Sequence, residues 1–371
     1  MNSENSLLYH TLLFSQLPKI GSITARKLIS ECGNAEAVLK EKKRNLIRIE
    51  GIGESHIKNI QTIDSSIVER VEKEMVFIEK HHIDTYILGE ENYPKRLKYC
   101  IDAPIVFFGK GHIEWNVPRV LAIVGTRKAS AYGLSFTKQL IADLAQIDVM
   151  IVSGLAYGID TEAHETALHY NLQTVGVLGH GLHMVYPSSN RKLATQMLRK
   201  GGLISEYFHE TGPDAIHFPS RNRIIAGLSD AVVVIEARKE GGALITADLA
   251  FSYDRDVFAV PGRVGDLCSE GCNDLIKQNK AAILTSAKDV IDWMRWDNSK
   301  TKARNRQEKM FFDVNDEERV VLEEVQQHDE IDIDTLLSKI NMPVSRLSVL
   351  LLSLECKCYI ECLPGKRYKI M

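Results

Sequence analysis

The stretch LAIVGTRKASAYG, Leu121–Gly133, decides the fold. Its first four residues are apolar and stop at Gly125, which is the pattern of a short, fully buried strand. Arg127 and Lys128 follow in a loop of small residues, and an amphipathic helix is expected at Leu134–Gln146. A strand, a glycine turn, a cation and a helix in this order can bind an anion, because backbone N–H groups and the helix dipole face negative charge. The alternative is an ordinary turn with a surface arginine.

The same alternation of apolar run, small residue and helix recurs along the middle of the chain. Strands of a parallel sheet joined by right-handed helical crossovers produce this alternation. Such a sheet gathers the loops that follow its strands at one edge, the carboxyl edge, where these folds bind ligands. The sequence therefore predicts an α/β, doubly wound, mostly parallel sheet, with further strands at Val149–Val152, Val175–Leu178, Leu203–Ser205, Ala231–Ile235, Val257–Val260 and Ala282–Leu284.

The composition is that of a soluble globular protein, since 44% of the 371 residues are hydrophobic and 26% are charged. The net charge of -3 requires that any surface for a polyanion be a local patch. We read no signal peptide, and no stretch reaches the ~18 apolar residues of a membrane span. Seven cysteines, an odd number, favour reduced thiols, so a cytoplasmic protein with no membrane partner is expected.

Motifs of metal and nucleotide chemistry are missing from the sequence. There is no GxxxxGK[ST] loop, no HExxH pair and no GxSxG turn. Zinc is an alternative for Cys268 with Cys272, and for Cys356, Cys358 and Cys362, but their spacings are irregular and include no paired CxxC set. We expect no metal, no cofactor and no catalytic residue.

Residues 1–85 are expected to form a helical domain of the helix-hairpin-helix or SAM-like kind. Two segments, Leu17–Ile29 and Ile49–Ile60, each place a glycine turn before a new helix. Such turns can present backbone N–H groups to a nucleic-acid phosphate, although the same hairpins also serve packing alone. The turn positions are Gly21, Gly51 and Gly53.

The α/β body is expected at 86–296, with Ile105–Phe108 as an edge or entry strand. A polar segment rich in Lys and Arg at 297–310 predicts a flexible basic linker. The remainder, 311–371, predicts three helices and a hairpin, which is a winged-helix order. Its third helix is poor in cations, so DNA reading, protein contact and a structural role all stay open. These elements are expected at Asn315–Gln327, Ile333–Ile340, Pro343–Glu355, Tyr359–Leu363 and Arg367–Ile370.

A second distinctive stretch is FPSRNRIIAG, Phe218–Gly227, in which Arg221, Asn222 and Arg223 are expected where a helix begins. Arginine is unfavourable at that end of a helix dipole, so a polyanion or a carboxylate partner is expected. Internal ion pairs to Glu206 or Glu236, which end two strands at the same edge, are the alternative, and one arginine can be structural while the other faces a ligand.

The segment GLAYGIDTEAH, Gly154–His164, follows the second strand of the series. Its glycines permit positive φ or close approach of the backbone, and Asp160 is placed to cap a helix that begins near Ile159. Asp160 and His164 lie four residues apart and could form a ligand pair. A hydrogen-bonded structural histidine is the more common outcome, and His180 and His183 are read in the same way.

Several stretches together resemble the DNA-processing protein A family, DprA or Smf, over Tyr93–Thr285. They are IVGTRKASAYG, IVSGLAYGIDTEAH, VGVLGHGLHMVYPSSNRKLA, GGLISEY, FPSRNRIIAGLSDAVVVIEA, GGALITADLA and VFAVPG, in this order. The resemblance implies a Rossmann-like domain and a role in natural transformation and recombination. It also implies a homodimer that binds and protects incoming single-stranded DNA, loads the RecA recombinase onto it and has no established catalytic activity.

The resemblance also implies a DNA-binding pocket at the carboxyl edge. The family's pocket arginines fall on Arg127, Arg221 and Arg223. The chain departs from the family pattern at Tyr157, which replaces a common arginine, and at Gly241-Gly242, which replaces a Ser-Gly type of entry. The expected DNA-binding residues are Gly125, Thr126, Arg127, Lys128, Ser153, Gly154, Tyr157, Gly158, Arg221, Asn222, Arg223, Gly241, Gly242 and Thr246.

Two other kinds of protein are kept as alternatives. The sheet also resembles nucleotide phosphoribohydrolases, but Leu249 stands where their loop carries an acid. The third possibility is an interaction scaffold with a vestigial pocket. For a homodimer, the apolar positions in Val290–Trp296 are the expected interface, with closure of the core as the alternative.

Overall fold

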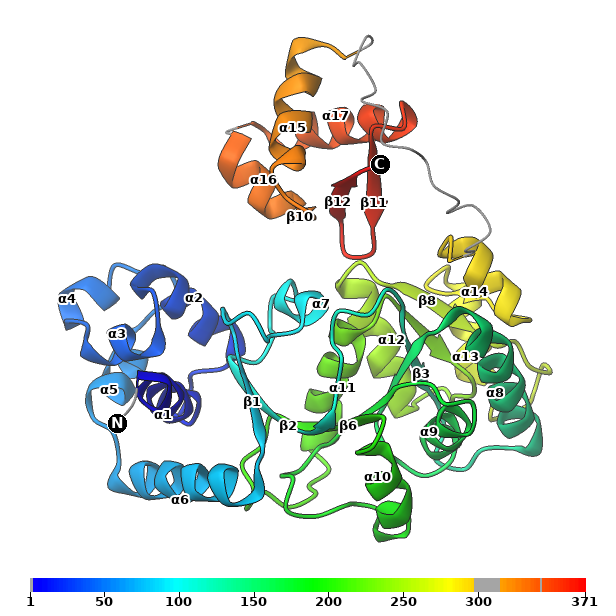
Figure 1. Ribbon diagram of the computed structural model, residues 1–371, viewed down its shortest axis with the longest axis horizontal. Coiled ribbons are helices and arrows are strands. Elements are labelled where there is room, and N and C mark those ends of the chain that lie inside the picture. The colour runs from blue at the N-terminus through cyan, green and yellow to red at the C-terminus, as the bar shows by residue number, and fades with distance from the viewer. Residues whose placement is uncertain (1–2, 297–313, 341) are drawn as a thin grey trace.

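The structure is a computed structural model that describes residues 3–296, 314–340 and 342–371. The basic linker expected at 297–310 lies outside the described residues. Figure 1 shows a helical N-terminal unit beside a large sheet covered by helices, and a small C-terminal unit.

The N-terminal unit consists of six helices, and the predicted glycine turns lie directly before two of them. Gly21 is the N-cap residue of α2 and Gly53 that of α5. Buried side chains of the unit share one core with Val106 and Phe108 of the sheet, so the unit packs against the α/β body. Its helices are α1 (Ser3–Ser15), α2 (Ser22–Cys32), α3 (Ala35–Lys40), α4 (Lys43–Leu46), α5 (Glu54–Gln61) and α6 (Ser65–His81).

The central sheet has nine strands in the order β1-β2-β6-β5-β4-β3-β7-β8-β9. The seven strands from β3 to β9 pair in parallel, as the sequence predicts, whereas β1 and β2 are antiparallel. The strands are β1 (Asp84–Ile87), β2 (Val106–His112), β3 (Val120–Val124), β4 (Met150–Ser153), β5 (Thr174–Val177), β6 (Gly201–Ser205), β7 (Ala231–Val234), β8 (Asp256–Ala259) and β9 (Ala282–Ile283).

Strand β1 was not predicted from the sequence and begins inside the region expected to be helical. With four residues it is too short for its alternation to stand out. It pairs with β2, so the strand expected at Ile105–Phe108 lies one position in from the edge of the sheet.

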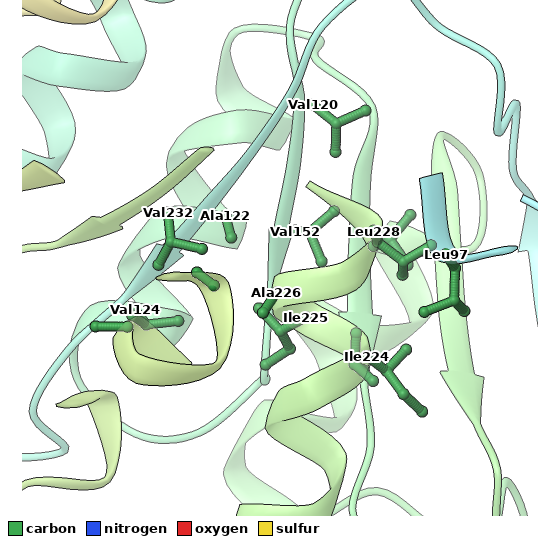
Figure 2. Packing of buried hydrophobic residues seen from close by; sticks show 14 of the residues in the cluster. Leu97, Val120, Ala122, Val124, Val152, Ile224, Ile225, Ala226, Leu228 and Val232 are labelled. Atoms are coloured by element: carbon green, nitrogen blue, oxygen red, sulfur yellow. The ribbon is translucent and has the colours of Figure 1, made fainter. Parts of the chain in front are cut away.

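Alternate residues of β3 face two separate cores, which explains the unbroken apolar run. Val120, Ala122 and Val124 belong to a core with α11 and α12, while Leu121 and Ile123 belong to one with α8, α9 and α14. Figure 2 shows the first core, where side chains of α11 face those of β3 and β4. The helices of the body are α7 (Lys95–Lys98), α8 (Ala131–Leu144), α9 (Ile159–His169), α10 (Arg191–Met197), α11 (His217–Leu228), α12 (Gly242–Ser252), α13 (Glu270–Lys277) and α14 (Ala287–Trp293).

Three helices begin earlier than expected. α8 begins at Ala131 rather than Leu134, because the Ser130 hydroxyl accepts a hydrogen bond from the N–H of Gly133 at 3.1 Å and caps the helix. α12 begins at Gly242 rather than Leu244. α11 begins at His217, so its arginines lie in the second turn, and the expectation that they lie where the helix begins was wrong.

The C-terminal unit contains three helices and a hairpin close to the expected ranges, with an additional short strand, β10, beside the hairpin. The tip of the hairpin contacts the body where β8 begins (Figure 1). Gly365 donates its N–H to the carbonyl of Asp254 at 3.0 Å, and the guanidinium of Arg255 donates to the carbonyl of Pro364 at 3.0 Å. The elements are α15 (Asp316–Gln326), β10 (Ile331–Asp332), α16 (Ile333–Ile340), α17 (Val344–Cys356), β11 (Ile360–Leu363) and β12 (Arg367–Ile370).

Within the described residues, no helix is both long enough and apolar enough to cross a membrane.

His164 lies on α9 inside the body and is fully buried. Its Nδ1 is hydrogen-bonded to the hydroxyl of Thr174 at 2.7 Å, so the structural reading of this histidine is correct. Burial, with a further contribution from Arg221, lowers the pKa of His164 to about 3. The side chain is therefore neutral in the folded protein at any pH above this value.

Because of this low pKa, the free energy of unfolding depends on pH. An unfolded histidine titrates near 6.5, so below this pH the unfolded chain binds more protons than the folded one, and the free energy of unfolding falls as the pH falls toward 3. Between pH 6.5 and pH 5 the free energy of unfolding of the variant His164→Asn should fall by about 2 kcal/mol less than that of the wild type. Urea unfolding over this pH range measures the difference. Parallel curves for the two proteins would contradict the assignment.

Candidate nucleic-acid interface

A cavity of about 720 Å³ opens at the carboxyl edge of the sheet, between the loops that follow β3 and β7 and the first turns of α11 and α12. The loops that the sequence predicted to converge therefore do so. Eight of the expected DNA-binding residues line the cavity, namely Gly125, Thr126, Arg127, Arg221, Asn222, Gly241, Gly242 and Thr246. Lys128, Ser153, Gly154, Tyr157, Gly158 and Arg223 are not among the lining residues.

The loop after β3 is held closely against the start of α9. A Cβ on Gly125 would lie 2.6 Å from the side chain of Ile159, so only glycine fits there. Gly158 has a φ of +78°, and a Cβ on it would lie 2.8 Å from the carbonyl carbon of Arg127. The N–H of Thr126 donates to the carbonyl of Glu236 at 2.8 Å, which ties the loop to β7.

Arg127 is exposed at the cavity, and its guanidinium carbon lies 5.1 Å from the centre of the Phe218 ring on α11. A cation over an aromatic face is attracted to the ring quadrupole, so this contact holds the side chain over α11 and leaves N–H groups free for a ligand. Lys128 is also exposed but outside the cavity, and its backbone N–H donates to the Thr126 hydroxyl at 3.2 Å.

Arg221 lies at the base of the cavity with 4% of its surface exposed. Its Nη1 donates to the carbonyl of Gly154 at 2.7 Å and to that of Val177, which joins the ends of β4 and β5. Burial lowers the pKa of Arg221 to about 10, while the neighbouring Asp160 carboxylate acts in the opposite direction. The Nε atom is buried and has no hydrogen-bond partner among the described residues.

Arg223 points away from the cavity and is paired with Glu206. Its Nη2 also contacts the Ser22 hydroxyl of α2 at 3.3 Å. The internal ion pair that the sequence left open is thus correct for Arg223 and Glu206. It is wrong for Glu236, whose carboxylate accepts hydrogen bonds from Ser130.

The segment after β4 serves mainly to support the site. Ser153 is fully buried, and its hydroxyl donates to the carbonyl of Ile123 at 2.6 Å. Gly154 leaves room for the Arg221 guanidinium, which a Cβ would displace. Asp160 does not cap α9 as expected, because its carboxylate accepts the N–H groups of Gly154 and Ala156 at 3.2 and 3.3 Å. Tyr157 is half exposed beside the cavity.

The N-terminus of α12 forms one wall of the cavity. The helix begins at Gly242, where a Cβ would meet no atom within 4 Å, so the backbone there is open to a ligand. The amide of Asn222 donates to the carbonyl of Gly242 at 3.2 Å and fixes this end of the helix against α11. Free N–H groups and the helix dipole favour an anion at such an end.

A family model described as DNA recombination-mediator protein A matches residues 84–295, which cover the whole sheet and the cavity. The chain belongs to this family.

Characterised relatives agree with the family assignment. The DNA processing protein DprA of Streptococcus pneumoniae is 40% identical over 208 residues, which are 56% of this chain and 73% of the relative. Protein Smf of Escherichia coli is 34% identical over 305 residues, which are 80% of this chain and 79% of the relative. The relatives from Streptococcus pneumoniae and Bacillus subtilis are named as DNA processing proteins and not as enzymes.

Solved structures of family members also resemble the chain. The X-ray structure of Streptococcus pneumoniae DprA matches with a TM-score of 0.62 and 32% identity, over 77% of this chain and 97% of that protein. A Helicobacter pylori DprA structure, described for its single-stranded DNA binding mode, matches with a TM-score of 0.52 and 30% identity, over 57% of this chain and 95% of that protein.

Several residues of this family member's cavity were missed in the sequence. Phe218 and Tyr186 add aromatic rings, and Arg238 and Glu240 add charges from the loop after β7. Arg238 stands between a strand end and the Gly-Gly turn, the same context that singled out Arg127, so the sequence did carry a signal for it. Phe218 could be linked to Arg127 only through the tertiary structure.

The helix that follows the first glycine turn contacts the α/β body, while Gly21 itself is exposed. Ser22, at the start of this helix, contacts Arg223 of the body. Arg26, one turn further, donates to the carbonyl of Lys98 at 3.0 Å and to that of Cys100. In this member of the family the first hairpin therefore packs against the α/β body, which is the alternative that the sequence left open.

Across residues 3–296, 314–340 and 342–371 no group of three or more His, Cys, Asp or Glu side chains could hold a metal ion, and the cysteines are free thiols. His180 is buried and hydrogen-bonded to the carbonyl of Gly181 at 2.9 Å, while His183 is exposed.

Proposed function

We propose that the protein binds single-stranded DNA at the carboxyl-edge cavity, protects incoming strands and loads the RecA recombinase onto them during natural transformation or recombination. One observation carries the proposal, namely that the exposed guanidinium of Arg127, the side chain of Arg221 and the N-terminus of α12 line one cavity. A phosphate oxygen can accept hydrogen bonds from an exposed guanidinium and from the free N–H groups of a helix N-terminus. The names of the relatives, and the single-stranded DNA binding mode of the Helicobacter pylori protein, support this function.

Within this proposal the expected site residues have two roles. Those that line the cavity contact DNA through guanidinium and backbone N–H groups. Ser153, Gly154 and Gly158 shape the loops, and Arg223 fixes α11 through Glu206. Lys128 and Tyr157 lie beside the cavity, where a cation and an aromatic ring can contact the continuing strand. We propose no catalytic residue.

Replacing Arg127 by alanine should weaken binding of a thymidine oligonucleotide about 10- to 100-fold, because a charged hydrogen bond contributes roughly 1.5–3 kcal/mol. The slope of log K against log salt should become shallower by about 0.7, the value for one phosphate contact on a single strand. Fluorescence anisotropy at several salt concentrations measures both quantities. RecA loading should fall with the affinity, measured as recombinase assembly on the strand. Unchanged affinity and slope in a folded variant would refute the assignment of Arg127.

The C-terminal unit, which we interpret as a winged helix, should be dispensable for this binding. Its hairpin contacts Asp254 and Arg255, which precede β8 and so lie at the amino edge of the sheet, opposite the cavity. On α17 the cation Arg346 is already paired with Glu317 at 2.5 Å. A chain that ends at Trp296 should therefore retain an affinity within about threefold of the full chain, which is under 1 kcal/mol. A loss as large as that of Arg127→Ala would place this unit or its linker in the site.

We also propose a homodimer, because two paired cavities raise the effective concentration of one strand without new contacts. The expected interface needs revision. Val290 and Trp296 are buried in the core, and Ile291 and Met294 pack against it, whereas Trp293 is 60% exposed and Ile283 on the edge strand β9 is 53% exposed. The exposed pair is the better candidate for the interface.

Sedimentation equilibrium at micromolar concentration should give a dimer for the wild type. The substitution Trp293→Glu should shift the monomer–dimer equilibrium toward monomer, because burying an unpaired charge in an apolar interface costs a large amount of free energy. Phe251→Glu, which changes another exposed aromatic residue on α12, is the matched control and should stay dimeric. A wild-type monomer that still binds DNA tightly would refute the paired-cavity argument.

A further inference from the structure

Glu236 is a buried acid directly behind a site that is rich in arginine, and nothing in the proposed function uses it. It follows β7 and has only 1% of its surface exposed. A buried carboxylate behind an anion site opposes anion binding through its charge. We therefore expect Glu236 to have a second role that offsets this electrostatic cost to anion binding.

The hydrogen bonds of Glu236 reach both ends of the loop that carries Arg127. Its backbone carbonyl accepts the N–H of Thr126 at 2.8 Å, directly before Arg127. One carboxylate oxygen accepts the N–H of Ser130 at 2.9 Å, and the other accepts the Ser130 hydroxyl. A single residue just after β7 thus spans the whole turn between β3 and α8.

The same carboxylate orients the cap of α8. Because the Ser130 hydroxyl gives its only proton to Glu236, its lone pair is left for the N–H of Gly133. Gly133 matches this arrangement, since a Cβ on it would lie 2.5 Å from the carboxyl carbon of Glu236. The start of α8 and the end of the Arg127 loop therefore depend on one side chain.

We propose that Glu236 is the positioning residue of the DNA site: it holds the Thr126–Ser130 loop so that Arg127 is presented to a phosphate of single-stranded DNA. This inference rests on the proposed function. A glutamine is a weaker anchor than the carboxylate, because it offers one neutral acceptor where Ser130 presents two donors. If its NH₂ group faces the Ser130 hydroxyl, that hydroxyl must accept rather than donate, and both charge-assisted hydrogen bonds that anchor the loop become neutral and weaker.

The positioning role and a purely electrostatic role predict opposite changes in the affinity of Glu236→Gln for single strands. If Glu236 acted on DNA only through its charge, Glu236→Gln would bind single strands more tightly. If it positions Arg127, the variant binds about 10-fold more weakly, as for the loss of one charge-assisted contact. Glu240→Gln is the matched control, because Glu240 is an exposed carboxylate that lines the same cavity without touching the loop. That variant should bind more tightly.

Anisotropy with a thymidine oligonucleotide and full-length protein tests the proposal. In Glu236→Gln the salt slope should become shallower by about 0.7, whereas mere partial unfolding lowers the active fraction and leaves the slope unchanged. The double variant with Arg127→Ala should bind no more weakly than Arg127→Ala alone, because the two residues act through one contact. Additive losses, or binding as tight as the wild type, would overturn the positioning role.

Gly133→Ala provides a second perturbation in case Glu236→Gln fails to fold. It keeps the carboxylate but pushes it away from Ser130, while alanine favours the helical conformation of α8. Weaker binding with retained thermal stability supports the proposal, and unchanged binding refutes it. A wild-type protein without affinity for single strands would instead refute the proposed function. The two failures are therefore distinguishable.

Discussion

The guanidinium of Arg221 lies between the carboxyl ends of β4 and β5 and binds a backbone carbonyl from each side. Removing such a cation from water costs several kcal/mol unless hydrogen bonds replace its hydration. Here they do so only in part, since Nε stays without a partner among the described residues. The Arg221 guanidinium thus joins the packing that closes the sheet edge to the base of the cavity.

The other features of the cavity follow from this close packing. Glycine is required at positions 125, 154 and 158 because Ile159, the Arg221 guanidinium and the Arg127 backbone occupy the space that a Cβ would take. Loops packed this closely have few alternative conformations, so little conformational entropy is lost when a ligand binds. The result is a local cationic site on a chain whose net charge is -3, with Glu240 as the one carboxylate among the described residues that line it.

The flanking units contact the body away from the mouth of the cavity. The N-terminal unit shares a core with β2 and contacts Arg223 through Ser22, on the side of α11 opposite Arg221. The C-terminal hairpin contacts residues that precede β8, at the amino edge. Neither unit contributes a described residue to the lining of the cavity.

The sequence alone determined the parallel sheet and the glycine loops that meet at its carboxyl edge. Strands buried on both faces must be continuously apolar, and close loops between strand and helix require glycine, so both features are local and visible in Leu121–Gly133. The position of Arg223 was not visible, because α11 begins one turn earlier than expected. Residues two apart on a helix point about 200° apart, which places Arg221 in the cavity and Arg223 against Glu206. The contacts of Arg127 with Phe218 and of Ser130 with Glu236 join residues about a hundred positions apart, so only the tertiary structure could decide them.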